Sequence, residues 1–487
     1  MFKRKNTCIF RLKTRAKIAH FLWINRLVFV RENKRKFVLL SCKTLRTIRP
    51  NFSQTLYLCV WLFCLIYLIL DLSKLKGSAL DTVEFIQIRR FIVKLGKMLH
   101  KYGTPAFRLE AYLGEVAKYL GVHASFISTP TSLTFVIWSD RHEDEYNHAA
   151  RLLPGELDMN ALSLTDELAS ELLTGKLTLS EADKRLNEID AMGSPYGKWV
   201  TGVAFAMATG AFAMLMGASW SEIGWSGALG IVAYLWTLWA QQSKRVNLML
   251  EPVTAFVGGI LACAIGQYVD PGINIPLVVL SSVIVFVPGL ALTMGLAELS
   301  SRNMVSGTAR TMDAIMQLFK LYFGAFLGVS VGFSAFGENV YTPAESLPYW
   351  ATWLAVFLLC IALVAIFRTR IKHIPWALAA AFIAYSATAW SSDYMSPGLG
   401  AFVGAFALGI FANAFTRIAN QPATIVAMHG LIVLVPGSKT YIGLNSFMTG
   451  QDFVKADHLG QEVFLIFMSL VAGLIFANVV VPTKKAL

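Results

Sequence analysis

Two copies of a Val-Pro-Gly motif interrupt apolar stretches of this sequence, and they are its first candidates for binding chemistry. Val287-Pro288-Gly289 lies in SSVIVFVPGLALTMGL, and Val435-Pro436-Gly437 lies in HGLIVLVPGSKTYIGL, 148 residues further on. Proline lacks a backbone donor and glycine accepts unusual dihedral angles, so each motif should break a helix. Paired breaks in corresponding halves are typical of a transporter's binding site. Two proline kinks that serve only helix packing are the alternative.

Two ionisable side chains close to the second motif are further candidates, because charges at membrane depth are rare and usually functional. Lys439 follows Gly437 by two residues and could offer a cation to a substrate carboxylate, or extend to the membrane surface. His429 precedes the glycine by about two helical turns and could carry protons, or pack as a hydrogen-bonded histidine. The predicted binding or gating residues are therefore Pro288, Gly289, Pro436, Gly437, Ser438, Lys439 and His429.

Other ionisable residues lie within the apolar stretches or close to their ends. Lys320 lies inside one stretch and Glu298 closes another, so both are possible coupling residues for an ion gradient. Glu251 and Glu462 open two more stretches. A position near the end of a span favours a solvated role for these three glutamates.

The composition predicts a mainly α, multi-span membrane protein. Of 487 residues, 55% are hydrophobic and 15% are charged, whereas a soluble domain has about a quarter charged residues. The formal charge of +13 comes from residues 1–50, where fifteen Lys or Arg face one acid, Glu32. The other 437 residues sum to −1, which leaves no basic face for a nucleic-acid partner.

The six cysteines do not indicate a disulfide framework or a zinc site. Four lie in the first 64 residues, and the other two, Cys263 and Cys360, lie inside apolar stretches. No pair has metal-ligand spacing. The sequence therefore implies neither a metal nor an organic cofactor.

Residues 80–195 are expected to form a small α+β domain. One helical face is formed by apolar residues at 88, 92, 95 and 99, and a second by those at 109, 113, 116 and 120. Residues 122–128 and 132–138 are predicted strands. Ser163 and Thr178 each precede an acid by three residues, which predicts two capped helix starts. Gly193-Ser194-Pro195 would end the domain as a linker.

The remainder of the chain is predicted to cross the membrane ten times. Five spans in residues 196–340 and five in residues 341–487 make an odd number per repeat, so the second repeat must be inverted relative to the first. Each stretch is close to the roughly 20 residues that a span needs. The predicted spans are 199–217, 223–240, 252–269, 273–297, 314–337, 347–367, 374–390, 397–415, 423–445 and 463–482.

Charges in the predicted loops orient this arrangement. Basic residues gather on the side of the α+β domain, as the positive-inside rule requires of a cytoplasmic side. The prediction is a multi-pass protein of the inner (plasma) membrane with a cytoplasmic N-terminal domain and C-terminus. The ten basic residues are Lys244, Arg245, Arg302, Arg310, Arg368, Arg370, Lys372, Arg417, Lys484 and Lys485, against Lys455 on the opposite side.

Residues 1–79 are a dubious N-terminal extension. The first fifty residues have no recognisable folding pattern, and residues 54–72 form one apolar run. The run could be a true span, the segment could be a targeting peptide, or the start could be set too far upstream. A true span would place the basic residues 1–50 outside, against the orientation above.

A family resemblance adds to this interpretation. The segment Lys94–Ile127 resembles the N-terminal domain of the threonine/serine exporter family, with Gly103, Arg108, Glu110 and Gly121 at the family's positions. The two Val-Pro-Gly segments resemble its two membrane modules. The resemblance implies a ten-span exporter of threonine and serine driven by the proton gradient. Two-polypeptide relatives are linked to succinate export, so a dicarboxylate stays open. Arg108 and Glu110 are expected to form an ion-pair network on their helix.

The expected function is thus that of a transporter and not of an enzyme, with a small-molecule substrate and membrane lipid as partners and a homo-oligomer left open. Lys439 and Lys320 are predicted in opposite halves of the membrane, so they should not meet at one small dicarboxylate. This favours a neutral zwitterion. The alternative from another class is a membrane-anchored hydrolase using the N-terminal domain, but Ser125 and Ser128 lack a Gly-x-Ser-x-Gly turn.

Overall fold

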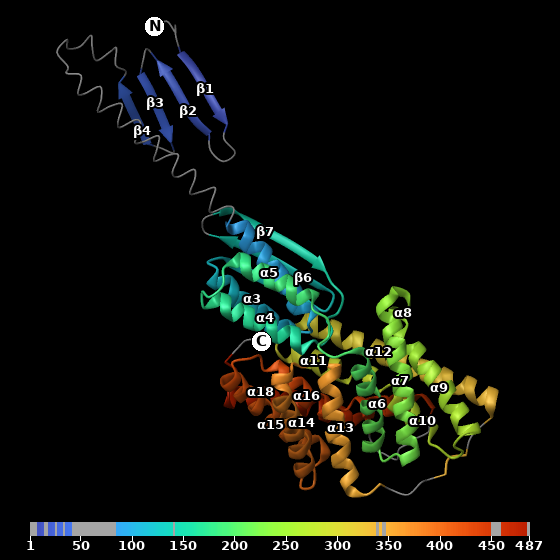
Figure 1. Cartoon of the computed structure of the whole chain (residues 1–487). Helices are drawn as coiled ribbons and strands as arrows, with labels where there is room; N and C mark the ends of the chain where they lie inside the picture. Colours follow the sequence, from blue (N-terminus) through green and yellow to red (C-terminus); the bar gives the residue numbers. More distant parts are fainter. Residues whose placement is uncertain are drawn as a thin grey trace, which may run out of the picture. The chain divides into compact units, whose positions relative to one another are not determined.

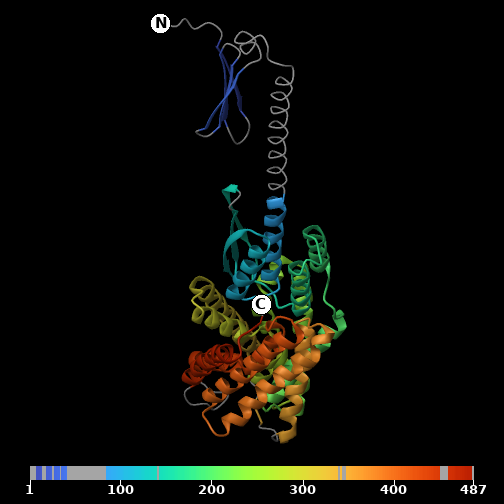
Figure 2. The ribbon, with the colours of Figure 1, turned by 90° about the vertical axis from the view of Figure 1, so that its left-hand side faces the viewer.

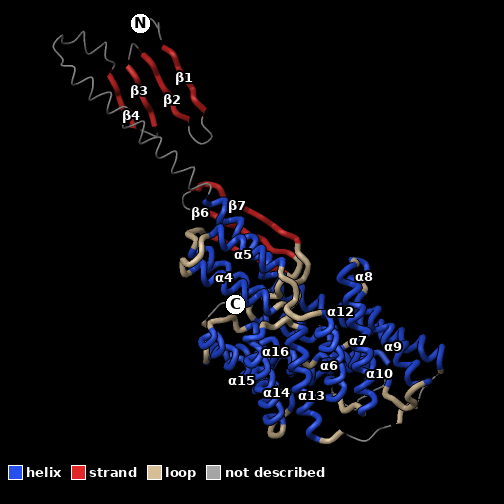
Figure 3. Tube along the Cα trace, in the orientation of Figure 1, coloured by secondary structure: helices blue, strands red, loops and turns tan. Residues whose placement is uncertain are grey.

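The computed structural model describes residues 7–13, 18–24, 27–32, 35–40, 84–139, 142–337, 340–342, 347–449 and 459–484. The chain divides into two compact units, Met1–Ile86 and Gln87–Leu487, which are considered separately. Figure 1 labels the elements along the chain, and Figure 3 shows that the strands belong to the first unit and to the beginning of the second.

The first unit contains an antiparallel sheet in which four strands follow chain order (Figure 1). The sequence interpretation found no folding pattern here, and that was wrong. The strands consist largely of β-branched, aromatic and other apolar residues. Only two residues separate the paired Ile24 and Leu27, and likewise Glu32 and Arg35. The apolar run 54–72 lies outside the described residues. The strands are β1 (Thr7–Lys13), β2 (Ile18–Ile24), β3 (Leu27–Glu32) and β4 (Arg35–Leu40).

The second unit begins with a region of helices and strands, residues 87–191, called the α+β region below. A helix that covers residues 87–101 of this unit and α3 (Ala106–Tyr119) precede three antiparallel strands. The strands are β5 (His123–Thr129), β6 (Ser132–Ser139) and β7 (His142–Arg151). Strand β7 was not predicted, because its sequence HEDEYNHAAR carries too many polar residues. Two helices, α4 (Met159–Leu173) and α5 (Leu179–Ala191), complete the region.

Burial in the α+β region follows the predicted periodicity. Ile92, Leu95 and Leu99 of the first helix are fully buried, as are Leu133, Phe135 and Ile137 of β6. Apolar residues recur with the helical period in the helix and with the two-residue period in the strand, so each element has one apolar face. The helices can therefore cover one side of the sheet.

Local signals in the α+β region had mixed outcomes. Gly103 interrupts the helices as predicted, and its φ is +80°. A Cβ at this position would lie only 3.1 Å from the Glu156 carbonyl oxygen. Thr178 starts α5 with the predicted capping box. The start predicted at Ser163 is wrong, because Asp158 caps α4 five residues earlier by accepting the Ala161 N–H.

The rest of the second unit is a block of helices, called the membrane region below. Small residues let its helices approach closely; a Cβ on Gly328 of α12 would lie 2.2 Å from the Phe256 carbonyl oxygen of α9. The helices are α6 (Lys198–Leu215), α7 (Trp220–Gln242), α8 (Lys244–Leu248), α9 (Leu250–Tyr268), α10 (Ile275–Ser282), η1 (Ile284–Phe286), α11 (Gly289–Ser300), α12 (Met304–Phe336), α13 (Tyr349–Ile366), η2 (Ile371–His373), α14 (Ile374–Ser392), α15 (Pro397–Ala419), α16 (Thr424–Leu434), α17 (Gly437–Thr449) and α18 (Leu459–Val480).

The number of candidate spans differs from the predicted ten. Among the described residues, eight helices are long and apolar enough to cross a membrane, or nine if the bent pair α10–α11 counts as one span. The predicted span 374–390 lies within α14, which is not among them. Helix α12 begins ten residues before the predicted start. Figure 2 gives a second view of this helix block.

Candidate functional site

The two Val-Pro-Gly breaks cross each other inside the membrane region. A Cβ built on Gly289 would lie 2.5 Å from Val435 Cγ1 and 2.9 Å from Gly437 Cα. A Cβ on Gly437 would lie 3.1 Å from Val287 Cγ1 and 3.3 Å from Gly289 Cα. The contacts are reciprocal, and the backbones are too close for any side chain at the first glycine. Two segments that are 148 residues apart in sequence therefore form one site.

Each break also starts a new helix. Pro288 precedes α11 and provides no side-chain cap, and α17 begins at Gly437. The first N–H groups of a helix have no intrahelical acceptor, so helix starts inside the membrane can bind polar groups. Ser438 lies in the first turn of α17, and its hydroxyl has no hydrogen-bond partner in the part of the chain that the structure describes.

The two predicted lysines each have a carboxylate partner on a neighbouring helix. Lys439 Nζ on α17 lies 2.5 Å from Glu462 Oε1 on α18. Lys320 Nζ on α12 lies 3.5 Å from Glu251 Oε2 on α9. The sequence interpretation had treated the lysines as single cations and the glutamates as solvated. The sequence alone could not show these ion pairs between helices, because hydropathy indicates how deep a residue lies in the membrane but not which side chain of another helix lies beside it.

His429 is a buried, hydrogen-bonded residue of α16. Its Nδ1 lies 2.9 Å from the Ile425 carbonyl oxygen, and its Nε2 lies 2.9 Å from Thr369 Oγ1. A carbonyl can only accept, so Nδ1 donates, and in the neutral ring Nε2 accepts from the threonine hydroxyl. The ring packs edge-to-face with the ring of Phe367. These contacts favour the packing alternative and leave neither nitrogen free for a ligand.

Glu298 closes α11 but is fully buried, so the predicted solvated role is wrong for this residue. Its Oε1 accepts the Ala106 N–H at 3.1 Å and pairs with Arg310 Nη2 at 3.1 Å, while Oε2 accepts from Ser306 Oγ at 2.7 Å. Ala106 is the first residue of α3, so the carboxylate caps that helix and meets its positive end. The end of the predicted span is thus the junction with the α+β region.

Arg108 does not form the predicted ion pair with Glu110. Its Nη1 donates to Thr424 Oγ1, the first residue of α16, at 3.0 Å. Glu110 instead accepts the Ser128 N–H at 2.7 Å. Burial lowers the pKa of Arg108 to about 10 and raises the pKa of Glu110. The first turn of α3 therefore touches both broken spans, α11 through Ala106 and α16 through Arg108.

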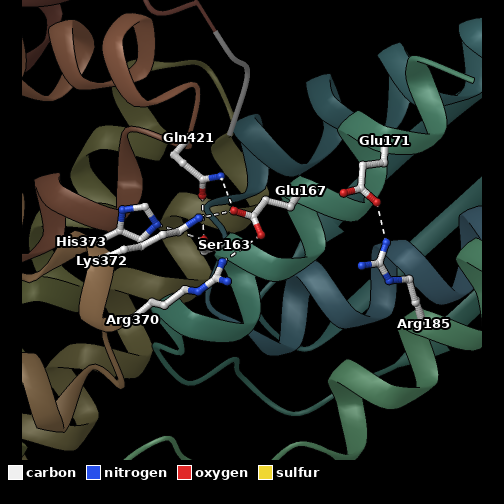
Figure 4. A network of polar contacts seen from close by, with 8 residues as sticks. All are labelled: Ser163, Glu167, Glu171, Arg185, Arg370, Lys372, His373 and Gln421. Carbon is white, nitrogen blue, oxygen red and sulfur yellow. Dashed lines mark hydrogen bonds and ion pairs between the residues drawn. The ribbon is translucent and has the colours of Figure 1, made fainter. Parts of the chain in front are cut away.

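A second junction joins α4 to the loop before α14 (Figure 4). Arg370 Nη1 lies 2.8 Å from Glu167 Oε2, and Lys372 pairs with the other oxygen of that carboxylate. Burial alone would raise the pKa of Glu167, but these two cations outweigh it and hold the pKa below its usual range. Sequence reasoning had counted both basic residues only as orienting charges.

His373 lies beside this carboxylate, in the same junction. Its Nε2 is 3.2 Å from Ser163 Oγ, which donates to Gln421 Oε1 at 2.7 Å (Figure 4). Burial, followed by the charges of Lys372 and Arg370, lowers the pKa of His373 to about 4. The ring is therefore neutral at pH 7.

Among the described residues, Ser125 and Ser128 do not form the arrangement that a serine hydrolase needs. Within the described ranges, the hydroxyls of Ser125 and Ser128 have no histidine or carboxylate partner. His100 Nε2 lies 3.0 Å from the Thr129 carbonyl oxygen. The same part of the chain holds no group of three His, Cys, Asp or Glu residues that could bind a metal ion.

Long apolar helices with two crossing breaks define a multi-span membrane protein. Residues 90–332 match the family described as "Putative threonine/serine exporter", and residues 352–480 match "Threonine/Serine exporter, ThrE". The chain belongs to the threonine/serine exporter family. The matches include α3 as well as both breaks.

Similar proteins are found among fungi. The chain is 26% identical over 372 residues to "Pheromone-regulated membrane protein 10" of Yarrowia lipolytica, covering 72% of this chain and 30% of that protein. It is 25% identical over 363 residues to the protein of the same name from Eremothecium gossypii, covering 72% and 48%. The chain thus spans less than half the length of these two relatives. No solved structure matches it.

Proposed function

We propose that this chain is a secondary transporter that exports small amino acids, threonine or serine, across the plasma membrane, and that the solute passes at the crossing of the two breaks. The observation that carries the proposal is the reciprocal contact of Gly289 and Gly437 in a chain of an exporter family. Backbone groups freed by a helix break in a membrane need polar partners, and a transported solute can supply them.

In the proposed architecture, α14 completes ten spans in two inverted repeats of five. Packing supports this, because the two most extensive helix contacts are α9 with α12 and α15 with α18. These are the third and fifth spans of each repeat. Two-fold relations produce reciprocal contacts, and Val287 with Gly437 and Val435 with Gly289 have this form.

In the proposed orientation, the α+β region and the C-terminus lie in the cytoplasm. The predicted excess of basic loop residues supports it. The contacts of Arg370 and Lys372 with Glu167 add a second argument, since these orienting residues must lie on the same side as the α+β region.

A zwitterion is the proposed solute, and a proton is the proposed coupling ion. Lys439 and Lys320 already have carboxylate partners, so neither is free to neutralise a second carboxylate. The alternative solute is a dicarboxylate such as succinate. For coupling, Glu298 is the candidate, because a proton on it would weaken its hold on Arg310 and on the first N–H of α3. The family matches favour a transporter over a hydrolase, and Ser125 and Ser128 have no basic partner among the described residues.

Efflux from preloaded cells tests this proposal. Cells with the full chain should lose labelled threonine or serine faster than cells with an empty vector, and a protonophore should abolish the difference. Cells with Gly289→Ala, compared at an equal amount of protein in the membrane, serve as the control with an altered crossing. Faster succinate efflux with unchanged threonine and serine would establish the dicarboxylate alternative instead. No change for any of the three solutes would contradict the proposed function.

A further inference from the structure

Arg108 is a charged side chain that has no countercharge among the described residues. The side chain is half-buried and offers five N–H donors. Among the described residues, one of these donors is paired, with Thr424 Oγ1 at 3.0 Å, and the guanidinium carbon lies 5.7 Å from the centre of the Phe107 ring. No carboxylate of the described residues lies within ion-pair distance of it. A buried charge normally has a partner, because desolvation without one is costly.

The other basic side chains of the two junctions differ from Arg108 in this respect, since each has a carboxylate partner. The pairs are Arg310 with Glu298, Arg368 with Asp158, Arg370 with Glu167, and Lys372 with Glu167.

The place of Arg108 adds an argument about what its partner is. Thr424 is the first residue of α16, so the guanidinium lies at the positive end of that helix. The residue before Thr424 supplies no side-chain cap to α16. The Ile425 and Val426 N–H groups already donate to the Pro422 and Ala423 carbonyl oxygens, so the guanidinium is the main feature that favours an anion at this point, and the helix dipole adds to it.

The same point lies at one end of both broken spans. Helix α11 runs from the first break to Ser300, and Glu298 in its last turn accepts the N–H of Ala106, two residues before Arg108. Helix α16 runs from Thr424 to the second break. At 1.5 Å per residue, its eleven residues place Thr424 roughly 16 Å from the crossing. A solute that moves along α16 towards the crossing meets Arg108 first.

We propose that Arg108 and Thr424 form a carboxylate-binding site on the cytoplasmic side, where the exported solute binds before it reaches the crossing. The planar guanidinium can take both oxygens of a carboxylate, and the threonine hydroxyl can donate to one of them. This inference rests on the proposed export function. The carboxylate can come from an amino acid or from a dicarboxylate, which share this chemistry.

The test measures transport by the full chain from the side of the α+β region. In inside-out membrane vesicles, uptake of labelled threonine and of labelled succinate gives KM and kcat for each solute. Arg108→Met keeps the length of the side chain but removes its charge and should raise KM about tenfold to a hundredfold. Arg108→Lys and Thr424→Val should raise KM less. Arg185→Met is the control, because Arg185 is an exposed arginine of the same region that pairs with Glu171.

Equilibrium binding to the purified full chain gives a second measurement, independent of transport. Threonine should raise the melting temperature of the wild type, whereas threonine amide, which lacks the carboxylate, should not. Arg108→Met should abolish that difference. Succinate, in the same assay, shows whether the site accepts a dicarboxylate.

The outcomes separate this inference from the proposed function. Transport by the wild type with an unchanged KM in Arg108→Met would overturn the carboxylate site and leave the exporter standing. A lower melting temperature and kcat with an unchanged KM would make Arg108 a structural contact only. If the wild type transports none of the solutes, the proposed function fails, and binding then decides: loss of carboxylate binding in Arg108→Met still supports the site. If neither solute binds the wild type, the site fails too.

Discussion

The two breaks share one motif but differ in shape. The first separates α10 from α11 by six residues, includes the short helix η1, and bends the span by 54°. The second separates α16 from α17 by two residues, within one continuous apolar span, Thr424–Ser446. The Val-Pro-Gly motif therefore permits a break, while the surroundings determine how far the span bends.

The surroundings of the two breaks differ at the junction with the α+β region. Every residue of α16 from Thr424 to Leu431 is buried, and His429 joins this helix to Thr369. Thr369 belongs to the loop that α4 holds through Arg370. Helix α11 instead meets the α+β region at its far end, through Glu298. Contacts with the α+β region thus hold the helix that precedes the proline at the second break, and the helix that follows the proline at the first break.

The largest expected effect is at the crossing itself. Gly289→Ala places a Cβ 2.5 Å from Val435 Cγ1 and 2.9 Å from backbone, whereas Gly437→Ala meets nothing closer than 3.1 Å. Overpacking of this kind costs about 1–3 kcal/mol, so transport and melting temperature should fall more for the first variant. Gly224→Ala, which meets no atom within 4 Å, should behave as wild type. Equal losses in all three variants would mean that the crossing has no special role.

The prolines come next in size. Pro288→Ala and Pro436→Ala restore a backbone donor and should reduce transport without preventing insertion. The loss should be larger for Pro288, since its span is the more strongly bent. Initial rates of threonine efflux, normalised to the amount of protein in the membrane, provide the measurement. Normal export by both variants would show that the breaks are packing kinks.

Acid should loosen the support of the second break. His373 binds fewer protons folded than unfolded between pH 4 and 6.5, because burial lowers its pKa to about 4. Its stabilising contribution is therefore complete above pH 6.5 and declines by at most about 1.4 kcal/mol per pH unit as the pH falls towards 4. The melting temperature of the wild type should fall between pH 7 and 5, and that of His373→Gln should fall less. The pKa of Glu167 is lowered from its usual value of 4.5, so this residue affects stability only below about pH 5. The melting temperature of Glu167→Gln should therefore change between pH 7 and 5 as it does in the wild type. An unchanged slope in His373→Gln would contradict this assignment.

The smallest expected effect concerns the lysine beside the second break. Lys439 is already neutralised by Glu462, and both side chains are partly exposed, so we expect Lys439→Met to reduce transport less than about fivefold. The reversed pair, Lys439→Glu with Glu462→Lys, should stay active. A loss above tenfold with a raised KM would instead assign Lys439 to the solute.

The sequence predicted the elements of this fold better than the contacts between them. Periodicity and hydropathy placed the buried faces of β6 and of the first helix, the helix breaks, and most of the long apolar helices. The crossing of Gly289 with Gly437 could not be predicted, because each motif shows only that a helix ends there. The errors at Glu298 and Arg108 have a related cause: both face the junction, and a pattern along one element does not show what covers it.

The contact of the breaks also has a consequence for biosynthesis. The first Val-Pro-Gly leaves the ribosome 148 residues before the second, which is roughly 7–30 s at usual rates of synthesis. During that interval Gly289 has no Val435 to pack against. Arg108 lacks its hydrogen-bond partner for a longer time, since Thr424 is synthesised 316 residues later. Insertion of α16 is therefore the step at which both the crossing and the contact of α3 with the second half can first form.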